Sequence, residues 1–213
     1  VKTMQDNLAG DPFFPLYATP PVLAKLIEQG ALGQKSGAGF FKKVGKEIHR
    51  FDFASGEYVA GGGKGDESVT KLLKEKDVAK RMAALRASDH PQAQFLWAIF
   101  RDAFHYVALH LETIADSARD IDFAMRWGYG WTTGPFEIWQ SAGWQQVAQW
   151  VKEDIDAGKA LCKAPLPAWV FDGRTGVHGP DGSWSSARMA NVPRNDLPVY
   201  RRQAFRAPLV GEA

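Results

Sequence analysis

The sequence predicts a mainly α-helical protein that also contains two small β-hairpins. Apolar residues recur at helical spacing over most of the chain. Strand-like patterns are confined to two short stretches, one of them marked by the turn dipeptides Asp172-Gly173 and Asp181-Gly182. The sequence lacks the alternation of strands and helices that would build a parallel sheet. We therefore expect a helical bundle with one hairpin before it and one after it.

The helices are predicted from apolar spacing and from the proline and glycine residues that bound them. Proline suits the first helical turn and glycine suits the residue after the last, so one helix is expected from Pro21 to Gly30. The helix that begins near Pro91 is the longest and is expected to be the central helix. The full set of expected helices spans residues 1–8, 21–30, 67–87, 91–115, 116–128, 136–143 and 144–157.

Two segments carry strand patterns. In residues 44–66, Ile48 and Phe51 precede a turn, after which Tyr58 begins a returning strand. Residues 169–184 show the second pattern. The glycine-rich run after the first hairpin is expected to be a linker and not a phosphate-binding loop, because Lys64 is followed by glycine where such a loop needs Ser or Thr.

Composition excludes several functional classes. The 213 residues are 45% hydrophobic and 23% charged, which is typical of a globular protein with a real core. The net charge of +2 gives no support for nucleic-acid binding, and no apolar run approaches the roughly 18 residues of a membrane span. Cys162 is the single cysteine, so an intramolecular disulfide is excluded. That usage fits a reducing compartment, and we expect a cytoplasmic protein.

Tryptophan is unusually frequent. The chain has 8 tryptophans, and six of them lie between Trp97 and Trp150. Such clusters occur in carbohydrate-stacking platforms and also as core or interface anchors on amphipathic helices. Their positions on predicted helices favour the second interpretation.

A search for catalytic chemistry finds little. Neither Gly128-x-Gly130 nor Gly37-x-Gly39 continues to the third glycine of a dinucleotide fingerprint, so no NAD site is expected within this chain. The five histidines form no cluster with ligand spacing, and we expect no metal site. Glu137 lies in the first turn of its helix, where the helix dipole stabilises a carboxylate.

Two motifs resemble the C-terminal domain of 3-hydroxyacyl-CoA dehydrogenases. Residues 120–131 followed by 134–137 resemble the D-I-D-x-A-M … G-x-G … G-P-F-E signature of that domain, and residues 32–41 resemble the L-G-x-K-x-G-x-G-F-Y stretch that ends it. The fold class implied is a helical bundle of that type. The matching residues are Lys35, Gly37, Gly39, Asp120, Asp122, Met125, Gly128, Gly130, Gly134, Pro135, Phe136 and Glu137.

The order of the motifs is informative, because in one family domain the D-I-D segment comes first, whereas here it comes second. The resemblance therefore implies two tandem copies and a chain cut from a longer polypeptide. Residues 1–43 would be the tail of a first copy and residues 44–89 a hairpin and linker helix. Residues 90–190 would be the second copy, and residues 191–213 a proline-rich linker or tail.

The family resemblance also predicts a role. The parent protein would oxidise an (S)-3-hydroxyacyl-CoA with NAD in fatty acid β-oxidation, but the family's catalytic His and Glu belong to a Rossmann domain that is absent here. The family's substrate-binding Asn has no equivalent in residues 95–102, where Arg101 alone echoes the motif. We therefore expect no catalytic, cofactor-binding or metal-binding residue in this chain.

The expected roles are acyl-CoA cleft formation, domain packing or dimerisation. The expected partners are acyl-CoA in the parent protein, the missing Rossmann domain, an enoyl-CoA hydratase or isomerase region, and a second copy in a homodimer. The alternative is a non-catalytic helical interaction module with no CoA contact.

The motif residues are expected to be packing devices. Ile121, Ala124 and Met125 share a helix face and should point inward. Gly128 and Gly130 should let the chain approach a neighbour closely.

Overall fold

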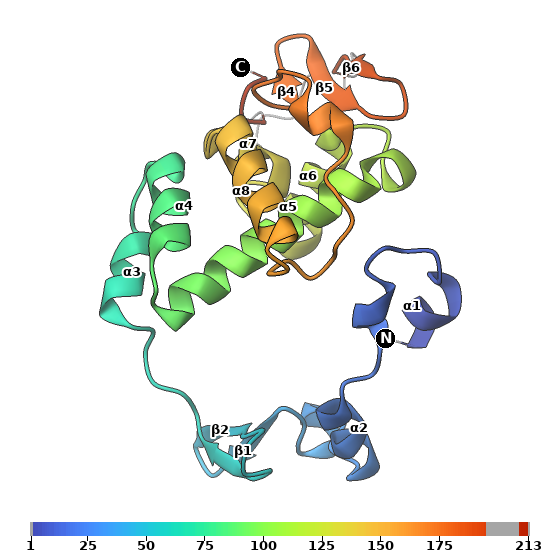
Figure 1. Ribbon diagram of the computed structural model, residues 1–213. Coiled ribbons are helices and arrows are strands. Elements are labelled where there is room, and N and C mark those ends of the chain that lie inside the picture. The colour runs from blue at the N-terminus through green and yellow to red at the C-terminus, as the bar shows by residue number, and fades with distance from the viewer. Residues whose placement is uncertain (1, 195–208, 213) are drawn as a thin grey trace. The chain divides into compact units, whose positions relative to one another are not determined.

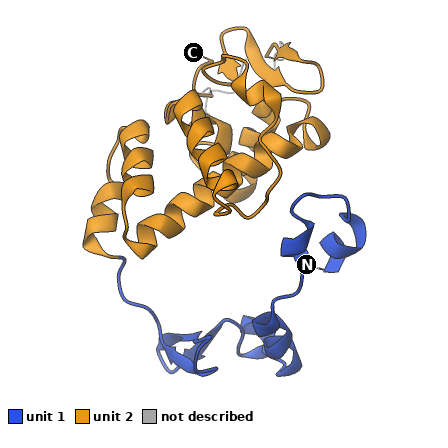
Figure 2. Ribbon diagram, viewed as in Figure 1, with its two compact units in different colours: residues 1–65 blue, residues 66–213 orange. Residues whose placement is uncertain are grey.

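The computed structural model describes residues 2–194 and 209–212 (Figure 1). The chain divides into two compact units, residues 1–65 and residues 66–213 (Figure 2). We call them unit 1 and unit 2 and describe each by itself. Eight α-helices and two small antiparallel sheets lie within the described residues, which confirms the mainly α fold with small β elements. None of the helices among these residues is long and apolar enough to cross a membrane.

Unit 1 holds two short helices and a three-stranded sheet. The helices are α1 (Lys2–Asn7) and α2 (Pro21–Glu28), and the strands are β1 (Phe41–Val44), β2 (Glu47–Phe51) and β3 (Tyr58–Ala60). The predicted hairpin is the β2–β3 pair, and β1 adds an antiparallel strand that the sequence analysis did not predict.

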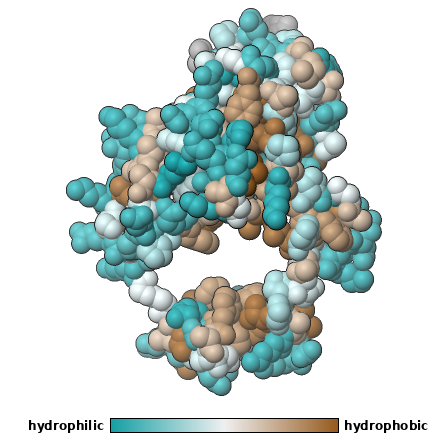
Figure 3. Space-filling view, in the orientation of Figure 1, coloured by the Kyte–Doolittle hydropathy of each residue, from teal (hydrophilic) through white to brown (hydrophobic). Residues whose placement is uncertain are grey.

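The surface of unit 1 carries several large apolar side chains. Leu32, Phe41, Ile48 and Phe53 are each at least 64% exposed, while Leu26 and Phe51 form part of a small core. Figure 3 shows the resulting hydrophobic patches on this unit. In the L-G-x-K-x-G-x-G-F stretch, a Cβ at Gly39 would lie 2.9 Å from the Cα of Gly33, so this glycine permits a close backbone approach.

Unit 2 begins with two helices, α3 (Glu67–Leu73) and α4 (Val78–Ala87), where one helix over 67–87 was predicted. The prediction of a single helix was wrong because Asp77 starts a new one. Its side chain accepts a hydrogen bond from the backbone N–H of Lys80, at 3.1 Å, as an N-cap residue does.

The remaining helices lie close to the predicted positions: α5 (Pro91–Ile114), α6 (Ala118–Tyr129), α7 (Pro135–Ser141) and α8 (Trp144–Asp156). The prediction that the longest helix is central is confirmed, since α5 contacts α4, α6, α7 and α8. It buries Trp97, Phe104 and Leu111 almost completely.

A run of stacked aromatic rings forms much of the core of unit 2. The rings of Trp139 and Trp144 lie 4.2 Å apart and nearly parallel, and Phe136 stacks against both. Trp169 extends the run toward Trp184. These side chains are buried, which fits the expectation that the tryptophans are core or interface anchors, whereas Trp127 is 48% exposed.

The second sheet comprises β4 (His178–Gly179), β5 (Gly182–Ser185) and β6 (Ala190–Val192), in the antiparallel order β4-β5-β6. Residues 168–171, where the strand pattern was expected to begin, form a turn of 3₁₀ helix instead. The predicted linker or tail, 191–213, lies largely outside the described residues, which resume at 209–212. Leu209 in that last segment is only 1% exposed.

Candidate functional site

The two aspartates of the D-I-D motif lie on different sides of α6, because residues two positions apart are separated by about 200° around a helix. Asp120 is exposed and belongs to a capping box. Its carboxylate accepts hydrogen bonds from the backbone N–H of Ser117, at 2.9 Å, and from the hydroxyl of the same residue, at 3.0 Å. Asp122 is fully buried and faces α7. Asp120 therefore caps the start of α6, its own helix, whereas Asp122 contacts α7.

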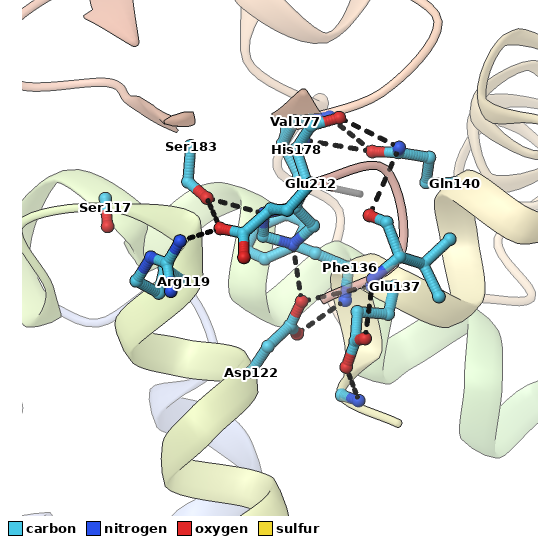
Figure 4. A network of polar contacts seen from close by, with 12 residues as sticks. Ser117, Arg119, Asp122, Phe136, Glu137, Gln140, Val177, His178, Ser183 and Glu212 are labelled. Carbon is cyan, nitrogen blue, oxygen red and sulfur yellow. Dashed lines mark hydrogen bonds and ion pairs between the residues drawn. The ribbon is translucent and has the colours of Figure 1, made fainter. Parts of the chain in front are cut away.

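Asp122 caps the start of α7 (Figure 4). Its two carboxylate oxygens accept hydrogen bonds from the backbone N–H groups of Phe136, at 2.9 Å, and Glu137, at 3.1 Å. A Cβ at Gly134 would lie 2.5 Å from the Cα of Asp122, so only glycine fits at this position. The D-I-D and G-P-F-E segments are thus two halves of one helix junction.

Glu137 completes this junction with a second buried carboxylate. Its Oε2 accepts from the backbone N–H of Gly134, at 2.7 Å, and its Oε1 accepts from the Arg126 guanidinium, at 2.5 Å. Arg126 is four residues after Asp122 and therefore lies on the same face of α6. The prediction that Glu137 is stabilised at the start of its helix is confirmed. Its ion pair with Arg126 was not predicted.

His178 joins the junction to the second sheet. One ring nitrogen, Nε2, lies 2.7 Å from Asp122 Oδ2, and the other, Nδ1, lies 2.8 Å from Ser183 Oγ. Burial raises the pKa of the Asp122 carboxyl above its ordinary value, although the hydrogen bond from His178 opposes that effect. The order Ser183–His178–Asp122 is similar to the catalytic triad of serine hydrolases. However, Ser183 is fully buried, and both carboxylate oxygens of Asp122 accept hydrogen bonds from backbone N–H groups of α7. The arrangement therefore fits a structural network.

Several sequence-predicted residues lie elsewhere. Ile121 is buried, but Ala124 is exposed and Met125 is half-exposed, so the prediction that all three point inward was wrong. Their face lines an open apolar groove of about 370 Å³ between α5 and α6, because Asp122 and Arg126 occupy the buried face instead.

The predicted close approach at two glycines was also wrong. A Cβ at Gly128 or at Gly130 would meet no atom within 4 Å. Gly130 is instead required for its positive φ of 70°, which ends α6. Arg101 forms buried ion pairs with Asp102, at 2.7 Å, and Asp154, at 3.5 Å, so it serves packing. In unit 1, Lys35 is exposed and Gly37 ends a short 3₁₀ turn with φ of 83°.

Arg126, His178 and Glu212 belong to the network but were not predicted from the sequence. A signal existed for Arg126, since a charged residue one helical turn from Asp122 shares its buried face. His178 is 56 residues from its partner Asp122, and no local pattern connects the two.

The fold and the site together define a helical domain in which the motif residues form the contacts that hold α6 and α7 together. The chain is similar to a Bacillus subtilis (strain 168) protein named as a 3-hydroxyacyl-CoA dehydrogenase, with 33% identity in an alignment of 154 residues that covers 67% of this chain and 20% of that protein. It is also similar to a protein of Rickettsia felis named as a fatty acid oxidation complex trifunctional enzyme, with 27% identity in an alignment of 168 residues that covers 76% of this chain and 21% of that protein.

A Rickettsia prowazekii protein with the same name is 24% identical in an alignment of 166 residues that covers 75% of this chain and 21% of that protein. The chain thus spans about a fifth of the length of these relatives. No protein-family model matches the chain, and no solved structure matches it significantly. The resemblance to 3-hydroxyacyl-CoA dehydrogenases that the two motifs indicated is confirmed over about 70% of the chain.

Proposed function

We propose that this chain is the C-terminal part of an NAD-dependent (S)-3-hydroxyacyl-CoA dehydrogenase of fatty acid oxidation, and that its role there is packing and not catalysis. One observation carries the assignment of the role. The buried carboxylates of the family motif, Asp122 and Glu137, are committed to the α6–α7 junction and to Arg126 and His178.

The described residues do not fit NAD. Both of their sheets are antiparallel, whereas a dinucleotide site needs parallel strands joined by a helix, with a glycine-rich turn at the pyrophosphate. Hydride transfer in the parent protein would therefore belong to its Rossmann domain. No reaction step is assigned to a residue of this chain.

The groove between α5 and α6 supports the packing role. It is lined mainly by apolar side chains, among them Val107, Ile121, Met125 and Trp131. An apolar groove of about 370 Å³ is a surface that another domain or subunit can cover. Domain packing and dimerisation both use such a surface.

The test is enzymatic. The purified chain, mixed with NADH and acetoacetyl-CoA, should show no NADH oxidation above the protein-free rate, and calorimetry with NAD⁺ should show no heat of binding. Saturable turnover by the pure chain would refute the packing role. Titration with an acyl-CoA addresses the alternative of an interaction module without CoA contact, because only a cleft-forming part of the dehydrogenase is expected to bind it.

A further inference from the structure

The segment 209–212, with the sequence Leu-Val-Gly-Glu, contacts residues of α6, α7 and the β4–β5 hairpin. Figure 4 shows Glu212 of this segment beside Arg119 and Ser183. It forms a compact turn, because the backbone N–H of Glu212 donates to the carbonyl oxygen of Leu209, at 3.1 Å. The Leu209 side chain is 1% exposed and that of Glu212 is 5% exposed. A turn whose first and last side chains are buried this deeply is held by specific contacts.

Two side chains of α7 hold the backbone of this turn. The N–H of Val210 donates to Glu137 Oε1, at 3.0 Å, and its carbonyl oxygen lies 3.5 Å from Gln140 Nε2. Glu137 and Gln140 are three residues apart, so they share one face of the helix. Gln140 is itself fixed, because its Oε1 accepts from the backbone N–H groups of Val177 and His178, at 2.8 and 3.0 Å.

The third position of the turn accepts only glycine. Gly211 has φ of 94°, in the left-handed region that disfavours other residues. A Cβ there would lie 2.5 Å from the carbonyl oxygen of His178. Both the backbone conformation and the lack of space therefore select glycine.

The fourth position is selected by charge. The Glu212 carboxylate forms an ion pair with Arg119 of α6, and it accepts a hydrogen bond from Ser183 Oγ, at 3.3 Å. The same hydroxyl lies 2.8 Å from His178 Nδ1, so the acceptor site is continuous with the α6–α7 junction. Loss of the carboxylate would leave the Arg119 charge, which is 17% exposed, without this partner.

We propose that the surface formed by α6, α7 and β4–β5 is a recognition site for a short peptide of the form Leu-x-Gly-Glu, and that residues 209–212 are its resident ligand. The backbone of the second residue contacts Glu137 and Gln140, and the glycine lies against the backbone of His178. The carboxylate pairs with Arg119, and the leucine side chain is buried. We expect a separate peptide of this sequence to make the same contacts once the chain's own segment is displaced. The proposal does not depend on the dehydrogenase assignment.

The test uses the full chain and a fluorescein-labelled peptide, Pro-Leu-Val-Gly-Glu-Ala, followed by fluorescence anisotropy. In the wild-type chain the tethered segment competes at an effective concentration on the order of millimolar. This competition weakens the apparent binding of the labelled peptide by about the ratio of the effective concentration to the peptide's intrinsic Kd. The Gly211→Val chain, which cannot dock its own segment, should bind the labelled peptide saturably.

Matched controls isolate each contact. A peptide with valine in place of glycine should bind neither chain. The Glu212→Arg chain should also bind the labelled peptide, because its own segment no longer pairs with Arg119. Adding Arg119→Glu restores the ion pair with reversed charges, so the chain's own segment should dock again and exclude the labelled peptide. Circular dichroism shows that each variant is folded. The proposal is overturned if folded variants with a released segment do not bind the peptide, if they bind it no better than wild type, or if the valine peptide binds equally.

Discussion

Asp122→Ala and Asp120→Ala offer a direct comparison of the two aspartates in one motif. Asp122 is fully buried and accepts from two backbone N–H groups and from the imidazole of His178. Each buried polar group that loses its partner costs about 1–3 kcal/mol, and Asp122→Ala removes the partner of three such groups. We expect Asp122→Ala to lower the free energy of unfolding of unit 2 by about 3–5 kcal/mol, a large part of the roughly 5–15 kcal/mol of a typical domain.

Asp120→Ala removes one exposed capping interaction and should cost only about 1 kcal/mol. Urea denaturation followed by tryptophan fluorescence measures both variants. All 8 tryptophans lie in unit 2, so the signal reports that unit alone. With a slope of about 2 kcal/mol per molar urea, the midpoint should fall by about 1.5–2.5 M for Asp122→Ala and by about 0.5 M for Asp120→Ala.

Equal losses for the two variants would refute the argument that the buried aspartate carries the helix junction. Asp122→Asn provides a further check, because the amide keeps one acceptor oxygen at nearly the same size. Its loss of stability should fall between those of the two alanine variants.

Three further predictions concern stability. Gly134→Ala should destabilise unit 2 by about 1–3 kcal/mol because its Cβ overlaps α6. Gly128→Ala should be neutral or stabilising by up to about 1 kcal/mol, because Gly128 lies inside a helix with open space around it. Thermal unfolding compares the two variants. Trp139→Ala should lower the free energy of unfolding by about 3–5 kcal/mol in the same urea assay, because Trp139 is fully buried. Trp127 is 48% exposed, so Trp127→Ala should cost less than about 1 kcal/mol. Equal losses for the two variants would contradict this order. Burial lowers the pKa of the His105 imidazole, so below the ordinary histidine pKa of about 6.5 the unfolded chain binds more protons than the folded one. The contribution of His105 to the free energy of unfolding should therefore be full above that pH and fall as the pH drops toward the lowered pKa. In urea titrations from pH 7.5 to 5, His105→Gln should flatten this pH dependence.

Local signals account for the elements that the sequence predicted well. The bounds of α5 and α7 follow from prolines at their starts, and the end of α8 follows from Gly158. The break between α3 and α4 was missed because Asp77 lies within a charged segment where a cap is difficult to distinguish from surface charge.

The candidate site was predictable only in part. The motif identified Asp122 and Glu137 but not what they bind. Glu137 contacts Val210, which is 73 residues away, and only tertiary structure brings such groups together. A charged residue on the buried face of a predicted helix is the general indication that a distant partner exists.

The stacked indoles of Trp139 and Trp144 have an optical consequence. Two chromophores whose rings lie 4.2 Å apart at an interplanar angle of 12° couple their electronic transitions, and such coupling depends steeply on separation. One indole belongs to α7 and the other begins α8. An exciton couplet in the circular dichroism spectrum would therefore report directly whether these two helices are docked, independently of how much helix the chain contains.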